Sequence, residues 1–164
     1  METSTSISTY KRLFGIGPLA LLISLFLLGL LWLLDRLFGP AAILNQPKPF
    51  KLLGIAFIGV WICWHSWAIK TIKEWWGRSR LCTSGPYRFV RHPMYAGGIF
   101  LADVGVVLLL NSWIVLVWPI LIYPIWSVLV RREEKLMESV FGEAYKTYAS
   151  HTGRLVPRFF KKRL

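Results

Sequence analysis

Cysteines and acidic side chains are both scarce in this chain of 164 residues. The 2 cysteines are Cys63, within an apolar run, and Cys82, within a basic loop, so their different depths do not favour a disulfide. They form no spacing typical of a metal site, and we predict no bound metal. Charged residues make up 17% of the chain, whereas a soluble domain usually has about 25%. A soluble globular domain is therefore disfavoured.

Long apolar runs occupy much of the chain instead. Residues 13–34, 52–69 and 113–130 contain no charged side chain, and a helix needs about 20 apolar residues to cross a bilayer. A fourth run, 95–110, is shorter and contains Asp103, so a re-entrant segment or a buried helix is an alternative to a crossing there. The first run is too long for a signal peptide and no small-residue cleavage site follows it, so we expect a retained helix.

The distribution of basic residues decides between three and four crossings. Of the 20 Lys and Arg residues, 17 lie before the first run, between residues 70 and 93, or after residue 130. Four crossings place these segments on one side, which the positive-inside rule makes cytoplasmic. We therefore predict an all-α integral membrane protein with four transmembrane helices and both termini in the cytoplasm. Basic residues at helix ends follow from topology and attract anionic lipids, so we expect membrane lipids and no nucleic acid as partners.

Two smaller elements follow from turn chemistry and periodicity. Asn111-Ser112 predicts a tight external turn that joins helices three and four as a hairpin. Beyond helix four, apolar residues recur every four positions, at Leu136, Val140, Ala144 and Tyr148. This spacing predicts one face of a cytoplasmic amphipathic helix, which Gly153 and Pro157 should end.

Residues 91–95 read Arg-His-Pro-Met-Tyr and lie where a basic loop meets helix three. Pro93 disfavours a helical His92 and suits the first turn of a helix. Free backbone N–H groups at such a helix start can bind an anion, and a carboxylate beside Arg91 or His92 is the expected guest. The alternative is a plain helix start with Arg, His and Tyr side chains as interfacial anchors.

Glu133-Glu134 form a second polar cluster at the end of helix four. Adjacent carboxylates beside a membrane are unfavourable unless they are solvated or paired. They could hold an ammonium group or a ribose; the alternative is local pairing with Arg131, Arg132 or Lys135. Because the hairpin of helices three and four joins the two clusters, we expect them to meet at its cytoplasmic end.

Isolated polar residues within the apolar runs are candidates for function, because such groups are unfavourable in a membrane. His65 and Ser66 lie in the second run, and Asp103 lies in the fourth. The alternative role of His65 is an interhelical hydrogen bond. The alternative for Asp103 is pairing within the bundle or contact with a cavity. Cys63 is expected to be inert.

The order of these motifs resembles one known family. Thr83-Ser84-Gly85-Pro86-Tyr87, then residues 91–97, then Glu133-Glu134, then Phe141-Gly142-x-x-Tyr145-x-x-Tyr148 resemble the isoprenylcysteine carboxyl methyltransferases and related phospholipid methyltransferases. The resemblance covers roughly residues 79–159. It implies an integral-membrane methyltransferase that uses S-adenosylmethionine and a lipophilic acceptor, with a carboxylate such as that of isoprenylcysteine favoured.

The length of the chain predicts a single membrane domain, 1–164, and the resemblance implies the roles of its two halves and of its site residues. Residues 1–70 would supply two transmembrane helices, and residues 71–164 would form the catalytic half that binds the cofactor. The residues that would line the cofactor are Leu81, Tyr87, His92, Pro93, Tyr95, Glu133 and Glu134, with Arg91 suited to its carboxylate. Arg131 or Arg132 would meet the substrate, and His92 would remove a proton from a thiol or amine acceptor.

Two other interpretations stay open. Membrane sterol reductases share a similar Arg-His-Pro-x-Tyr hairpin and bind NADPH there, although their chains are generally longer. A non-catalytic membrane scaffold could also retain the fold. The compact four-helix chain favours the cytoplasmic membrane of a prokaryote, with the site facing the cytoplasm.

Overall fold

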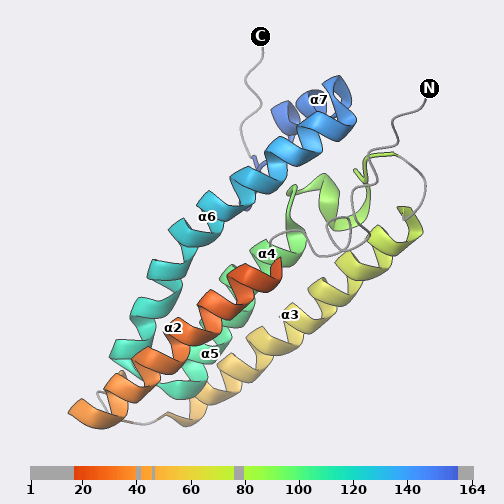
Figure 1. Cartoon of the computed structure of the whole chain (residues 1–164). Coiled ribbons are helices and arrows are strands. Elements are labelled where there is room, and N and C mark those ends of the chain that lie inside the picture. The colour runs from red at the N-terminus through yellow and green to blue at the C-terminus, as the bar shows by residue number, and fades with distance from the viewer. Residues whose placement is uncertain (1–16, 40–41, 46, 76–79, 159–164) are drawn as a thin grey trace.

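The computed structural model describes residues 17–39, 42–45, 47–75 and 80–158. These residues form four long helical runs, which Figure 1 shows passing up and down beside one another. The first two runs are α2 (Gly17–Phe38) and α3 (Lys48–Trp75). The third joins α4 (Pro93–Gly97), the π-helical turn η2 (Gly98–Ala102) and α5 (Asp103–Leu110). The fourth is α6 (Trp113–Phe141), which is followed by the short helix α7 (Glu143–His151). A 3-10 turn, η1 (Gly85–Arg88), precedes α4.

All four long runs are long and apolar enough to cross a membrane, which confirms the predicted all-α membrane fold. The third run extends over 18 residues, Pro93–Leu110, so its length suits a crossing rather than a shorter buried segment. Both α3 and α6 continue beyond their apolar runs at the ends. Residues 13–16 of the first apolar run lie outside the described residues.

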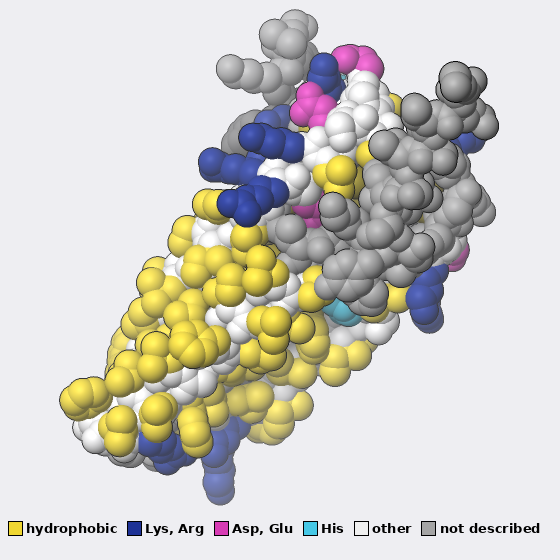
Figure 2. Space-filling view, viewed as in Figure 1, with side chains coloured by type: hydrophobic (Ala, Val, Ile, Leu, Met, Phe, Trp, Pro, Cys, Tyr) yellow, Lys and Arg dark blue, Asp and Glu magenta, His cyan; other side chains and the backbone are white. Residues whose placement is uncertain are grey.

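Lipid-facing and interior surfaces differ in the size of their side chains. Large apolar side chains point outward, as with Leu22 and Phe26, which are 66% and 70% exposed, and they form the yellow surface in Figure 2. Between α3 and α5, by contrast, a Cβ atom on Gly54 would lie 2.9 Å from the carbonyl oxygen of Gly105. Small residues let membrane helices approach closely, so this pair sets the α3–α5 contact.

The predicted turn at Asn111-Ser112 is confirmed. Asn111 has a left-handed backbone with φ 49°, and Ser112 caps α6 by accepting a hydrogen bond from the Val115 N–H at 3.2 Å. The Ser112 hydroxyl also donates to Asp35 of α2 at 2.6 Å. At mid-bundle the Trp118 and Trp126 indoles of α6 donate to Ser24 of α2, both at 3.0 Å. These contacts place α2 against α6.

The helix expected after helix four is present as α7, which ends before Gly153, but its predicted apolar face begins too early, at Leu136. Helix α6 continues without interruption to Phe141, and the chain then breaks at Gly142 with φ 54° and ψ −127°. This backbone conformation strongly favours glycine. Leu136 and Val140 therefore belong to α6, whereas Ala144 and Tyr148 belong to α7. Figure 1 shows α7 folded back beside the end of α6.

The isolated polar residues take different places. The interhelical hydrogen bond expected for His65 is not formed among the described residues: its buried Nδ1 has no partner, and its ring lies 5.5 Å from that of Trp61. Asp103 is buried, while Ser66 and Cys63 are exposed on α3. Both cysteines are free.

Candidate functional site

The two predicted polar clusters meet at one end of the bundle. We call this region the polar end and define it as residues 80–92, the part of α6 from Arg131 onward, α7, and residues 152–158. Its backbone is joined where Val90 pairs with Gly153, and the N–H groups of Arg91 and His92 donate to Gly153 and Arg154 at 2.8 and 3.2 Å. A Cβ atom at Gly153 would lie 1.8 Å from the Val156 carbonyl oxygen, so only glycine fits there.

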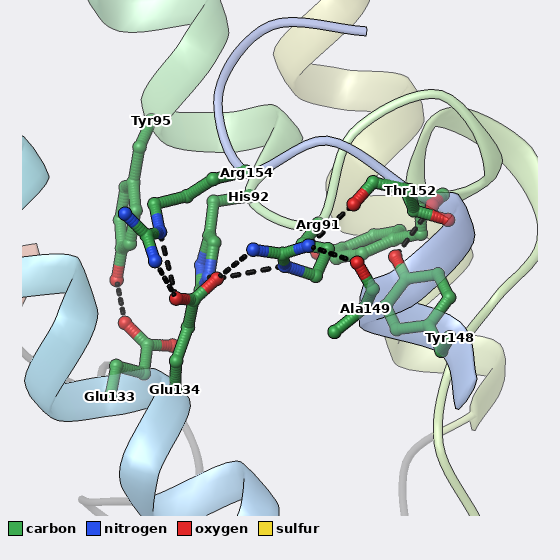
Figure 3. Close-up of polar contacts among 10 residues, drawn as sticks. Arg91, His92, Tyr95, Glu133, Glu134, Tyr148, Ala149, Thr152 and Arg154 are labelled. Carbon is green, nitrogen blue, oxygen red and sulfur yellow. Dashed lines mark hydrogen bonds and ion pairs between the residues drawn. The ribbon is translucent and has the colours of Figure 1, made fainter. Parts of the chain in front are cut away.

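Arg91 connects three segments of the polar end (Figure 3). Its Nε and Nη2 atoms both lie 2.7 Å from Glu134 Oε1 on α6. Its Nη1 donates to the carbonyl oxygen of Ala149 at 2.8 Å and to that of Thr152. The side chain is 9% exposed, so this buried guanidinium fixes α7 and the following residues against α6.

Arg154 holds the other oxygen of the same carboxylate. Its Nε and Nη2 lie 2.7 and 2.6 Å from Glu134 Oε2. His92 Nε2 lies 3.6 Å from Glu134 Oε1, too far for a hydrogen bond. The alternative of local pairing with Arg131, Arg132 or Lys135 is therefore wrong for Glu134, whose partners come from 43 and 20 residues away.

His92, Tyr95 and Glu133 form a second group beside this ion pair. The His92 and Tyr95 rings stack with centroids 5.6 Å apart and an interplanar angle of 5°. The Tyr95 hydroxyl donates to Glu133 Oε2 at 3.0 Å, and its ring lies 4.7 Å from that of Trp126. The sequence prediction that residues 91–95 meet Glu133-Glu134 is thus realised in space.

A cavity of about 290 Å³ opens beside these groups. Its lining residues come from α6, α7 and the segments around them: Arg91, Arg131, Glu134, Lys135, Glu138, Tyr145, Lys146, Ala149 and Arg154. Five of these are cationic and two are carboxylates, so the cavity favours a ligand with an anionic group. Its volume is close to the lower end of ligand pockets, which start at about 300 Å³.

Two buried polar atoms of the polar end have no hydrogen-bond partner in the described part of the chain. They are His92 Nε2 and the Tyr145 hydroxyl. Burial raises the pKa of Tyr145, and the Glu134 carboxylate raises it further, so the hydroxyl keeps its proton at neutral pH. Buried polar groups are normally paired, so both atoms are suited to a ligand.

The other predicted site residues lie around this centre. Tyr87 is buried against Ala68 and Cys82, and its carbonyl oxygen accepts from Tyr148 at 2.6 Å. Pro93 is fully buried, and its carbonyl oxygen accepts from the Trp64 indole at 2.7 Å. Leu81 is half-buried in the loop before η1.

The two arginines expected to meet substrate are both exposed on α6, and they differ in position. Arg131 lines the 290 Å³ cavity, whereas Arg132 does not. Side chains on neighbouring helix positions point about 100° apart, which explains the difference.

Sequence reasoning missed Arg154 and the role of Tyr145. Both lie near the C-terminal motif Phe141-Gly142-x-x-Tyr145-x-x-Tyr148. Apolar periodicity there indicated a helix face with Ala144 and Tyr148 and gave no role to Tyr145 or Arg154. The available signal for Arg154 was its place directly after Gly153, a residue already expected to end a helix. Hydrogen bonds to Glu134 raise the pKa of Arg154 and keep it charged.

Comparisons with known proteins show the family to which the chain is similar. The family model for phospholipid methyltransferases matches residues 50–144, which is more than half of the chain. A protein-S-isoprenylcysteine O-methyltransferase of Dictyostelium discoideum is 24% identical over 158 aligned residues, covering 75% of this chain and 67% of that protein. The protein of the same name from Schizosaccharomyces pombe is 31% identical over 78 residues, covering 47% and 33%.

No solved structure matches the chain significantly. Both relatives are eukaryotic, so the prokaryotic membrane and the cytoplasmic orientation stay predictions. The matched residues include α3 from residue 50 onward, the loop that contains η1, the hairpin of helices three and four, and Glu133-Glu134. This chain therefore belongs to the phospholipid methyltransferase family of membrane proteins.

Proposed function

We propose that the protein transfers a methyl group from S-adenosylmethionine to a lipophilic acceptor, with a carboxylate such as that of isoprenylcysteine favoured. The observation that carries this proposal is the junction of residues 91–95 with Glu133-Glu134 beside a cationic cavity. The names of the two relatives support an isoprenylcysteine carboxylate as the acceptor.

The residues at the junction fit this cofactor. The cationic cavity suits the cofactor's carboxylate, and Tyr145 could donate a hydrogen bond to it or to the ribose. Glu133 Oε2 accepts from Tyr95, while its second oxygen is available to an ammonium or a hydroxyl group. The aromatic rings of Tyr95 and Trp126 lie 4.7 Å apart and could face a sulfonium cation.

When bound, S-adenosylmethionine supplies an electrophilic methyl group: the acceptor oxygen forms a C–O bond while the S–CH₃ bond breaks and its electron pair stays on sulfur. A carboxylate acceptor is already ionised at neutral pH, so no residue must remove a proton. The contribution of the chain is then positioning, because in-line transfer depends on how the two reactants are held. The Arg91–Glu134–Arg154 contacts supply a rigid frame for this.

A binding experiment tests the proposal. Purified protein in detergent is titrated with S-adenosylmethionine and, separately, with NADPH. We expect binding of S-adenosylmethionine, and about tenfold weaker binding in His92→Ala, since a hydrogen bond of a buried group contributes roughly 1.5 kcal/mol. His151→Ala is the matched control, because His151 is exposed on α7 and, within the described part of the chain, bonds only to Thr147 and Ser150.

Thermal unfolding of each variant verifies that it is folded. If His92→Ala is unfolded, Tyr145→Phe removes only the unpaired hydroxyl and tests the same site. Tight binding of NADPH without any binding of S-adenosylmethionine would contradict the proposal in favour of a reductase. Transfer of a radiolabelled methyl group into membrane extract then identifies the acceptor.

A further inference from the structure

Helix α2 lies outside residues 50–144, the part of the chain that the family model matches. Its first two turns nevertheless contact aromatic side chains of the candidate site. Three small residues, Gly17, Ala20 and Ser24, recur at three- and four-residue spacing and therefore share one face of the helix. Ala20 and Ser24 are 0% and 5% exposed, so this face packs against the rest of the bundle.

Ser24 fixes the orientation of the Trp126 indole. The Ser24 hydroxyl donates its hydrogen to the Ala20 carbonyl oxygen at 2.9 Å, which leaves its lone pairs to accept. It accepts from Trp126 Nε1 at 3.0 Å. An indole has a single N–H donor, and an unpaired donor within a membrane is costly. Because rotation of the Trp126 ring would break this bond, the ring is held in one orientation.

The Trp126 ring in turn packs on Tyr95. The two ring centroids lie 4.7 Å apart, with the planes inclined by 45°. Tyr95 also stacks on His92 with an interplanar angle of 5°. Its hydroxyl donates to Glu133 Oε2 at 3.0 Å (Figure 3). The position of the Tyr95 ring therefore determines where the Glu133 carboxylate is held.

Gly17 gives α2 a second, direct contact with Tyr95. A Cβ atom on Gly17 would lie 3.2 Å from the Tyr95 hydroxyl oxygen, so a side chain there would displace the hydroxyl. Figure 1 shows the first turn of α2 beside α4, the short helix that carries Tyr95. Gly17 and Ser24 are two turns apart, about 10 Å along the helix axis. Helix α2 thus acts on Tyr95 at two separate points.

We propose that Gly17 and Ser24 are positioning residues for the Tyr95 side chain. Ser24 acts through the Trp126 ring, whereas Gly17 leaves the room that the Tyr95 hydroxyl needs to reach Glu133. A sulfonium cation that faces the Tyr95 and Trp126 rings is then held by a wall that α2 keeps in place. This effect on the cofactor rests on the proposed function, whereas the positioning of Tyr95 does not.

Fluorine NMR of protein labelled with fluorotyrosine tests the positioning without any ligand. The Tyr95 signal is the one that is lost in Tyr95→Phe. We expect Ser24→Ala and Gly17→Ala each to shift this signal. Trp126→Phe keeps an aromatic ring but lacks the N–H donor, so it should shift the signal as well and provides the test if Ser24→Ala is unfolded. Adding Ser24→Ala to Trp126→Phe should cause no further shift, because both changes remove the same bond.

Two matched controls accompany these variants. Ser66→Ala changes an exposed serine of α3, and Gly29→Ala adds a methyl group in open space on α2. Both should leave the Tyr95 signal at its wild-type position. An unshifted Tyr95 signal in both Ser24→Ala and Trp126→Phe would overturn the proposal, and a further shift in the double variant would overturn the role of Trp126.

Ligand titrations test the effect on the cofactor. S-adenosylmethionine carries a sulfonium cation, whereas S-adenosylhomocysteine lacks both the methyl group and the charge. We expect Ser24→Ala to raise the Kd of the first about threefold, the effect of a weakened cation–π contact, and to leave the Kd of the second unchanged. A purely structural role would weaken both equally, and that result would overturn the effect on the sulfonium. If the wild type binds neither compound, the proposed function fails, and the fluorine signal alone supports or overturns the positioning of Tyr95.

Discussion

Glu134 is held by two guanidinium groups that come from different parts of the chain. Arg91 precedes α4, and Arg154 follows α7. The Glu134 side chain is only 11% exposed, so desolvation opposes its charge unless both oxygens are paired. The geometry meets that condition with contacts of 2.6 to 2.7 Å on each oxygen. This single carboxylate therefore determines how residues 152–158 pack against the loop that contains Arg91.

Replacing Glu134 with Gln should destabilise the protein. The change leaves the buried Arg91 guanidinium without a countercharge, which costs about 3 kcal/mol in comparable buried pairs. Unfolding by sodium dodecyl sulfate in mixed micelles measures the change in the free energy of unfolding. Glu143→Gln is the control: its pair with Lys146 is exposed, and its loss should cost at most about 0.5 kcal/mol. Equal effects of the two changes would show that the buried pair contributes no more to the free energy of unfolding than the exposed pair does.

Among the individual helices, α6 and the turn at its end do most to position the residues of the polar end. The helix contains Pro119 and Pro124 yet continues to Phe141, and neighbouring helices can compensate for the lost hydrogen bonds of such prolines within a membrane. It stops only at Gly142, whose backbone turns α7 back along the polar end. The reversal brings the Ala149 and Thr152 carbonyl oxygens to Arg91.

Gly142→Ala should loosen α7 without unfolding the bundle. A side chain at φ 54° and ψ −127° is strained, at a cost of about 1–3 kcal/mol. We expect faster amide hydrogen exchange in residues 143–155 and weaker binding of S-adenosylmethionine, with α2 to α5 unchanged. Gly29→Ala, in open space on α2, should leave the exchange of residues 143–155 at the wild-type rate. Unaltered exchange in Gly142→Ala would mean that this glycine is not required for the turn.

The whole molecule pairs α2 with α6 and α3 with the run of α4, η2 and α5. The first pairing uses indole hydrogen bonds to Ser24, and the second uses close backbone contact at Gly54 and Gly105. The two pairs bring the third run and α6 together in a hairpin whose open end carries the candidate site. Bundle packing therefore positions residues that are far apart in the sequence.

Gly54→Val should separate α3 from α5 and lower the stability of the whole bundle. Its added Cβ would lie 2.9 Å from the Gly105 carbonyl oxygen and 3.0 Å from the Leu109 side chain, and such overpacking costs about 1–3 kcal/mol. The midpoint of thermal unfolding in detergent should fall. Gly59→Val on the same helix meets open space and should have little effect. If both variants unfold at the same temperature, the Gly54–Gly105 contact does not determine the packing.

The sequence by itself determined the four crossing helices, the turn at Asn111-Ser112 and the meeting of residues 91–95 with Glu133-Glu134. Long apolar runs and their charged flanks are local properties of the sequence. A short turn between helices three and four makes them antiparallel, so their far ends must lie close together. Only the tertiary structure decided that Glu134 pairs with Arg91 and Arg154 rather than with its helix neighbours. Those partners are brought in by the reversal at Gly142 and the pairing of Val90 with Gly153, and neither the direction of a chain reversal nor a contact across 43 residues is encoded by local periodicity.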